Sequence, residues 1–149
     1  MSEAEFVKVK YRLTEQVARP GGMTAGMASD RAQRELAAHA GDAMKSIGAM
    51  IGRLEAMSRE QNVSLDTVYG EASTILDVAG LFDKRVLCDA CYSLCELVDR
   101  QRTHSRLDWT SITVHVSALR LLWTKDGQDP ATLKSVVDGL WSITDRLNP

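Results

Sequence analysis

Apolar residues recur every three or four positions along most of the chain beyond residue 22, and this spacing constrains the fold more than any other feature. Side chains spaced in this way lie on one face of an α-helix, whereas a half-buried strand needs strict alternation. No segment beyond residue 22 alternates cleanly. The pattern therefore predicts an all-α fold with helices over about 29–54, 64–80, 83–100, 108–125 and 129–147.

Residues with known capping and turn preferences mark the ends of these helices. Ser64 is a good N-cap, Gly80 can end the helix that follows, and Asp129 is an N-cap in front of Pro130 at the first helical position. The intervening loops are short, so neighbouring helices should pack antiparallel, as in a bundle. Each predicted helix has an apolar stripe, which in the first of them includes Leu36.

The first 22 residues differ from the rest and are expected to form an N-terminal arm, extended or partly ordered. Apolar and charged residues alternate there as in a short strand or an extended docking segment. The apolar members of this pattern are Phe6, Val7, Val9, Tyr11 and Leu13. The sequence ARPGG then interrupts regular structure. Residues 23–149 are expected to form one domain, a length that can bury a substantial core.

Charge and hydropathy exclude several classes of function. The chain has 149 residues, a net charge of −2 and a pI near 5.9, so it has no strong field to attract nucleic acid or an anionic membrane. It contains no apolar run long enough for a transmembrane helix, and its charged start does not resemble a signal peptide. We expect a cytoplasmic protein, whose cysteines stay reduced, with no nucleic-acid or membrane partner.

The three cysteines lie together in CDACYSLC, as Cys88, Cys91 and Cys95. Their spacing places them on one face of a predicted helix, which favours small buried side chains in a helix interface. A metal site through these three thiols is an alternative, but it needs a further ligand, such as His104 or His115. We expect packing, with no metal and no cofactor.

The remaining sequence contains no motif of an enzyme. GxGxxG, GxxxxGK[ST], HExxH and GxSxG are absent, and the three histidines are scattered. His115 lies in the largely apolar ITVHVSAL, where a hydrogen-bonded packing role is expected. Arg100, Arg102 and Arg106 are expected to form a solvated turn.

The segment EASTILDVAGLFDKRVLCDACYSLCELVD resembles the centre of a histidine phosphotransfer (HPt) domain, in particular the small HPt proteins of alphaproteobacteria. Such proteins carry AHDxKGxxxxFG on one helix, SLC near the end of the next, and HVxALR on the one after. The PGG of the N-terminal region is similar to their lead-in. The matching positions are Ala72, Ile75, Gly80 and Phe82, then Ser93, Leu94 and Cys95, then His115, Val116, Ala118, Leu119 and Arg120.

The resemblance implies a four-helix HPt-like core with an additional N-terminal helix or arm, but the residues of phosphotransfer are replaced. Ser73 occupies the position of the phosphoacceptor histidine, Leu76 that of the lysine, and Asp77 that of the glycine after it. Serine is a weak nucleophile without an activating base. Leucine offers no positive charge to a phosphoryl group, and an aspartate repels one.

We therefore predict a non-catalytic, pseudo-phosphotransfer protein that binds a response-regulator receiver or a histidine kinase in two-component or chemotaxis signalling. The predicted partner-binding residues are Tyr69, Gly70, Glu71, Ser73, Thr74, Leu76 and Asp77, with Leu76 expected to be exposed. One alternative is an active phosphotransfer protein that uses His115 or His39. Another is the metal-binding protein described above. A homodimer is compatible with the sequence.

Overall fold

A computed structural model describes residues 13, 17, 20–126 and 128–146, and all secondary structure in these residues is helical. The all-α prediction is thus confirmed for the described part of the chain. The alternating residues of the predicted arm lie outside it, apart from Leu13, whose side chain is exposed.

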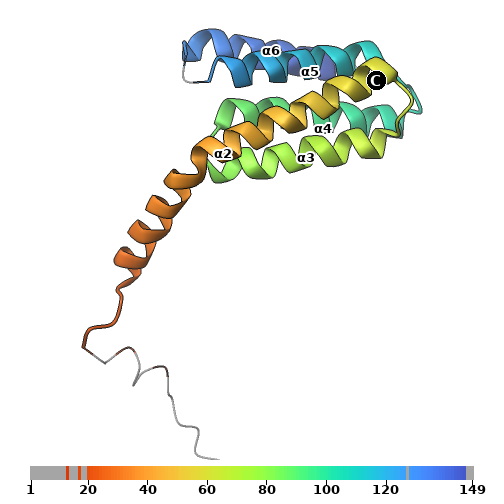
Figure 1. Ribbon diagram of the computed structural model, residues 1–149. Coiled ribbons are helices and arrows are strands. Elements are labelled where there is room, and N and C mark those ends of the chain that lie inside the picture. The colour runs from red at the N-terminus through yellow and green to blue at the C-terminus, as the bar shows by residue number, and fades with distance from the viewer. Residues whose placement is uncertain (1–12, 14–16, 18–19, 127, 147–149) are drawn as a thin grey trace, which may run out of the picture. The chain divides into compact units, whose positions relative to one another are not determined.

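The chain divides into two compact units, residues 1–35 and residues 36–149. Helix α2 begins in the first unit and continues into the second, and four further helices follow it there (Figure 1). The bounds are α2 Ala25–Glu60, α3 Leu65–Leu81, α4 Arg85–Thr103, α5 Trp109–Thr124 and α6 Pro130–Asp145.

Side-chain caps fix three of the helix starts where the sequence predicts them. Ser64 accepts a hydrogen bond from the backbone N–H of Thr67 at the start of α3, and Asp108 accepts one from Ser111 at the start of α5. Asp129 caps α6 in the same way, just before the proline. Because a capping side chain and the backbone N–H that donates to it lie within one turn, local sequence alone decides these boundaries.

The end of α3 differs slightly from the prediction. The helix continues through Gly80 to Leu81, and the N–H of Phe82 bonds to the carbonyl of Ala79. The left-handed conformation that reverses the chain falls on Asp83, with φ of 53°. Aspartate tolerates this region better than most residues do, so no glycine is needed.

The core of the second unit gathers around α4, which packs against α3, α5 and α6. All five helices contribute to it, mainly through aliphatic side chains at the predicted spacing. Fully enclosed members include Ile47, Leu54, Ile75, Leu94, Leu97, Ile112 and Leu119. The core thus joins the residues that the periodicity of each helix had placed on one face.

The second half of α2 is held against α5 by polar as well as apolar contacts. The indole Nε1 of Trp123 donates to the carbonyl oxygen of Met44 at 2.7 Å. Arg120 pairs with both carboxylate oxygens of Glu55 at 2.8 Å and also donates to the carbonyl of Gly48. These contacts attach α2 to a helix more than sixty residues further along the chain.

Leu36 lies on the predicted apolar stripe of α2 but is not part of the core. Its side chain is 40% exposed, although it continues the spacing of the buried residues Ile47, Ile51 and Leu54. The apolar stripe therefore begins nearer the start of α2 than the buried residues of this helix do, since the first of these is Ile47.

Candidate functional site

The predicted partner-binding residues lie on α3, but they do not all face solvent. Tyr69, Gly70, Thr74 and Asp77 are exposed, whereas Glu71, Ser73 and Leu76 are half-buried. The expectation of an exposed Leu76 is wrong, because its side chain packs against the core. It follows Ile75, which is fully enclosed, and thus lies at the edge of the buried stripe of α3.

Ion pairs match two of the three carboxylates on α3. Arg53 of α2 pairs with Glu71 at 2.6 Å, and Arg102 of α4 pairs with Asp66. Arg102 also lies over the ring of Tyr69, 5.2 Å from its centroid. Asp77 has no ion-pair partner among the described residues.

Ser73 has no hydrogen-bonded base among the described residues. A serine hydroxyl needs such a base, or a metal, to become a strong nucleophile. The other hydroxyl on this face, that of Thr74, donates to the carbonyl of Gly70 one turn earlier. Among the described residues, this face therefore has no activated hydroxyl nucleophile.

His115 lies in a buried polar network between three helices. Its Nδ1 lies 2.9 Å from the carbonyl oxygen of Ser111, which fixes the proton on that nitrogen. Its Nε2 lies 3.1 Å from Oγ of Ser93 on α4 and 3.3 Å from Oγ1 of Thr144 on α6. The side chain is 0% exposed, and burial lowers its pKa by disfavouring the imidazolium. The predicted hydrogen-bonded packing role is confirmed.

Ser93 and Thr144 are structural residues that the sequence reasoning did not assign. Both are completely buried, and their hydroxyls lie 3.1 Å apart. A sequence signal existed for Ser93, since it interrupts an otherwise apolar stretch of a predicted helix. Nothing in the sequence indicated that it would meet Thr144.

The three cysteines form the predicted packing stripe. Cys91 and Cys95 are buried and Cys88 is half-buried. Burial raises the pKa of all three thiols, to about 11 for Cys95, so none is activated as a thiolate at neutral pH. No group of three potential ligands that would hold a metal occurs within the described residues.

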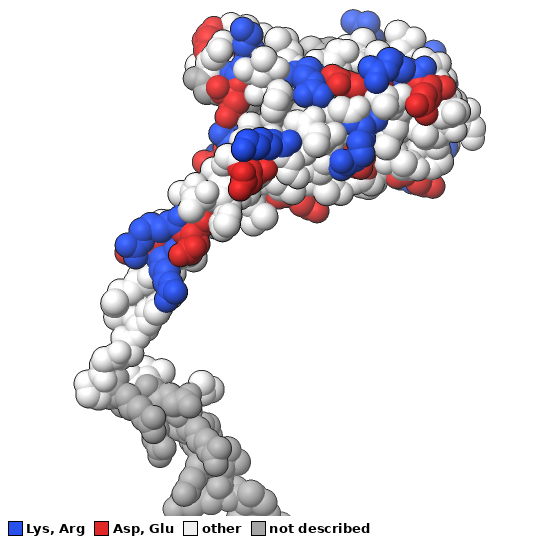
Figure 2. All heavy atoms as spheres, in the orientation of Figure 1, with Lys and Arg blue, Asp and Glu red and all other residues white. Residues whose placement is uncertain are grey.

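Two of the three arginines expected in a solvated turn are anchored instead. Arg100 lies within α4, pairs with Glu96 at 2.8 Å, and reaches Asp145 of α6 at 3.3 Å. Arg102 bridges Asp66 and Asp99. On the face drawn in Figure 2, basic and acidic side chains likewise lie close together.

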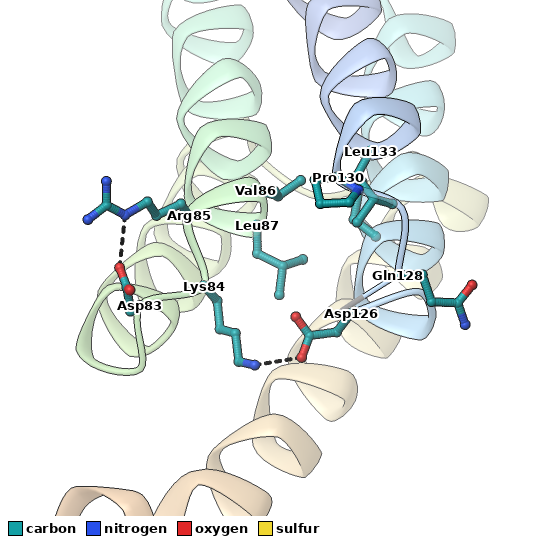
Figure 3. A pocket seen from close by; sticks show the side chains of 10 residues that line it. Asp83, Lys84, Arg85, Val86, Leu87, Asp126, Gln128, Pro130 and Leu133 are labelled. Carbon is teal, nitrogen blue, oxygen red and sulfur yellow. Dashed lines mark hydrogen bonds and ion pairs between the residues drawn. The ribbon is translucent and has the colours of Figure 1, made fainter. Parts of the chain in front are cut away.

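A shallow pocket of about 250 Å³ lies where the start of α4 meets the α5–α6 connection (Figure 3). Lys84 pairs across it with Asp126 at 2.6 Å, while Arg85 points away and pairs with Asp83. Leu87 forms part of its apolar lining. Since its charged groups pair with one another, the pocket offers no unmatched charge that would select a ligand.

Within the described part of the chain, no helix combines the length and the apolar character that crossing a bilayer requires. Comparison with protein-family models, with curated proteins and with solved structures finds no match to this chain.

Proposed function

We propose that this chain is a pseudo-phosphotransfer protein: a helical bundle that binds a receiver domain or a histidine kinase and carries no phosphoryl group. In this proposal residues 36–145 are the antiparallel, HPt-like core and the exposed part of α3 is the docking face. By occupying the docking surface of its partner, the chain would block or scaffold a step of a two-component or chemotaxis phosphorelay.

The main support for the proposal is that the surroundings of Ser73 on α3 do not favour phosphotransfer. The position that the sequence resemblance assigns to a reactive histidine holds a half-buried serine without a base. Its neighbour Asp77 is exposed and negatively charged, which disfavours a phosphoryl group nearby. Leu76 does not support the proposal, because its packing against the core explains why a leucine lies at this position.

The alternative phosphoacceptors are less well supported. His115 is enclosed, and both of its ring nitrogens have hydrogen-bonding partners. His39 is exposed on α2, but it lies on a different helix from the α3 face. The metal alternative is weakened because the described residues contain no group of three side chains that could hold a metal ion.

Binding of purified receiver domains and histidine kinases from the source organism, measured by calorimetry, tests this proposal. Thr74→Arg places a long charged side chain on the exposed side of α3 and should weaken the binding by about tenfold or more. Ser117→Arg introduces the same side chain on the exposed side of α5 and should leave binding unchanged.

Two results would overturn the proposal. One is that no receiver or kinase binds the wild-type chain. The other is that the partner binds Thr74→Arg as tightly as the wild type, which would place the docking surface away from α3.

A further inference from the structure

Helices α4 and α6 run side by side in the same direction, with residues facing one another in a regular register. Ser93 meets Thr144 through their hydroxyls, and Tyr92 faces Trp141 with ring centroids 5.7 Å apart. One turn further along both helices, Glu96 and Asp145 contact the same side chain, that of Arg100.

At Glu96 and Asp145 the chain fills the groove with its own arginine. The Nε of Arg100 contacts Glu96 at 2.8 Å, and a terminal nitrogen contacts Asp145 at 3.3 Å and the carbonyl oxygen of Thr144 at 3.0 Å. A guanidinium suits this position because it is planar and donates in several directions.

Asp89 and Asp138 lie one heptad earlier on the same two helices, and no arginine of the described residues forms an ion pair with either of them. They line a groove of about 300 Å³ whose other walls include Val86, Val137 and the ring of Trp141. Figure 3 shows Val86 at the start of α4 pointing towards the first turn of α6.

One of the two carboxylates at this groove, that of Asp89, is unmatched, in the sense that it forms no ion pair with the described residues. Lys134, itself in the lining, contacts Asp138 at 2.9 Å and 3.2 Å. Arg85, one turn before Asp89, is directed to Asp83 at 2.9 Å. Asp89 is exposed and has no ion-pair partner among the described residues. The unmatched carboxylate complements a positive charge from outside the chain.

An aromatic pair adjoins the unmatched carboxylate. The ring of Tyr92 is 56% exposed and inclined at 47° to the ring of Trp141. The faces of tyrosine and tryptophan attract cations, and arginine most often among protein side chains. The neighbouring valines offer an apolar surface for the stem of such a side chain.

We propose that the groove between the first halves of α4 and α6 binds an arginine from a peptide segment of another protein. The guanidinium pairs with Asp89 and lies against Trp141 and Tyr92, while its aliphatic stem covers Val86 and Val137. This arrangement repeats, one heptad away, what Arg100 does within the chain. The inference is independent of the proposed function, because it uses neither α3 nor a phosphorelay partner.

The test uses a displayed library of short random peptides selected on the full-length protein. Affinities are then measured by fluorescence anisotropy for the best peptide and for its analogue with citrulline, an uncharged isostere, in place of arginine. We expect arginine to be enriched, and both citrulline and Asp89→Asn to weaken binding by about tenfold.

Glu60→Gln, an equivalent neutralisation of an exposed carboxylate at the end of α2, serves as the matched control and should leave the affinity unchanged. Equal melting temperatures of the two variants would establish that both are folded. The proposal is overturned if no peptide is selected, if arginine is not enriched, if the citrulline analogue binds as well, or if Asp89→Asn has no effect.

Discussion

Gly48 shows how one distant neighbour determines which residue a helical position accepts. A Cβ atom built at this position lies 2.6 Å and 2.9 Å from atoms of the Trp123 ring, which is held in place by its bond to Met44. We expect Gly48→Ala to lower the free energy of unfolding by about 1–3 kcal/mol, because the rigid ring must move. Urea denaturation measures the change.

Gly139→Ala is the matched control in α6, where an added Cβ meets nothing within 4 Å. It should raise the free energy of unfolding by up to about 1 kcal/mol, because alanine is the better helix former. If both substitutions stabilise the protein, Trp123 does not occupy the position described.

Burial of His115 makes stability depend on pH. Its pKa is lowered in the folded protein, whereas in the unfolded chain it returns to about 6.5. Below about pH 6.5 the unfolded chain therefore binds a proton that the native protein excludes, and stability falls as the pH decreases. Between pH 7.5 and 5.5 we expect a loss of at most about 1.4 kcal/mol, the limit set by the pKa of the unfolded chain, measured by urea denaturation.

The variant His115→Gln should show a flatter dependence over the same pH range, whatever its overall stability. His39→Gln, at an exposed position, should keep the wild-type dependence. An unchanged slope in His115→Gln would show that this histidine is not the buried titrating group.

Cys91 provides a direct test of the cysteine packing. Its side chain is 0% exposed, so Cys91→Asp would bury a carboxylate and should cost about 3 kcal/mol or more. Cys91→Ala removes only the sulfur and should cost far less. Thermal denaturation compares the two, and a Cys91→Asp variant that melts like the wild type would contradict the helix orientation.

At the scale of elements, the attachment of α2 to α5 depends on the bidentate pair between Arg120 and Glu55. Their side chains are 32% and 31% exposed, so solvent only partly screens the pair. A double-mutant cycle with Arg120→Met and Glu55→Gln should give a coupling free energy of about 1 kcal/mol.

The exposed pair of Lys45 and Asp42, within α2, is the control for this cycle. Its atoms are 3.6 Å apart and both side chains are more than 80% exposed, so its coupling should be near zero. Equal coupling in the two pairs would mean that the contact between α2 and α5 does not restrict the Arg120 side chain.

The sequence predicts the helices well because their signals are local. The caps at Ser64, Asp108 and Asp129 and the apolar spacing within each helix require only neighbouring residues. The exposure of Leu36 and the partial burial of Leu76 were not predictable, because spacing identifies a face but does not tell how far another helix covers it.

The polar contacts between helices are less predictable. The group of Ser93, His115 and Thr144 joins residues from three helices, and only the packed structure brings them together. The same holds for Arg100, whose partner on α6 lies 45 residues away in the sequence. For the candidate site, the sequence predicted a docking face around Ser73, which remains a prediction, and it did not show which neighbouring carboxylates have partners.

At the scale of the whole molecule, we propose a protein that acts by binding a partner rather than by transferring a phosphoryl group. His115 is the one histidine of this chain that matches the HPt pattern. It lies on α5, where its ring contacts hydroxyls of α4 and α6 and so helps to hold these three helices together. The unmatched carboxylates at Asp77 and Asp89 lie on different helices, α3 and α4. They are separate candidate contacts, and their substitution should affect different partners.

The most direct test of the central claim is a phosphotransfer assay. The chain is incubated with a radiolabelled, autophosphorylated histidine kinase and its receiver, and the label on each protein is followed over time. The account predicts no base-stable label on this chain, together with an altered rate of transfer between kinase and receiver when the chain is in excess. Base-stable, acid-labile label that disappears in His115→Gln or His39→Gln would contradict it.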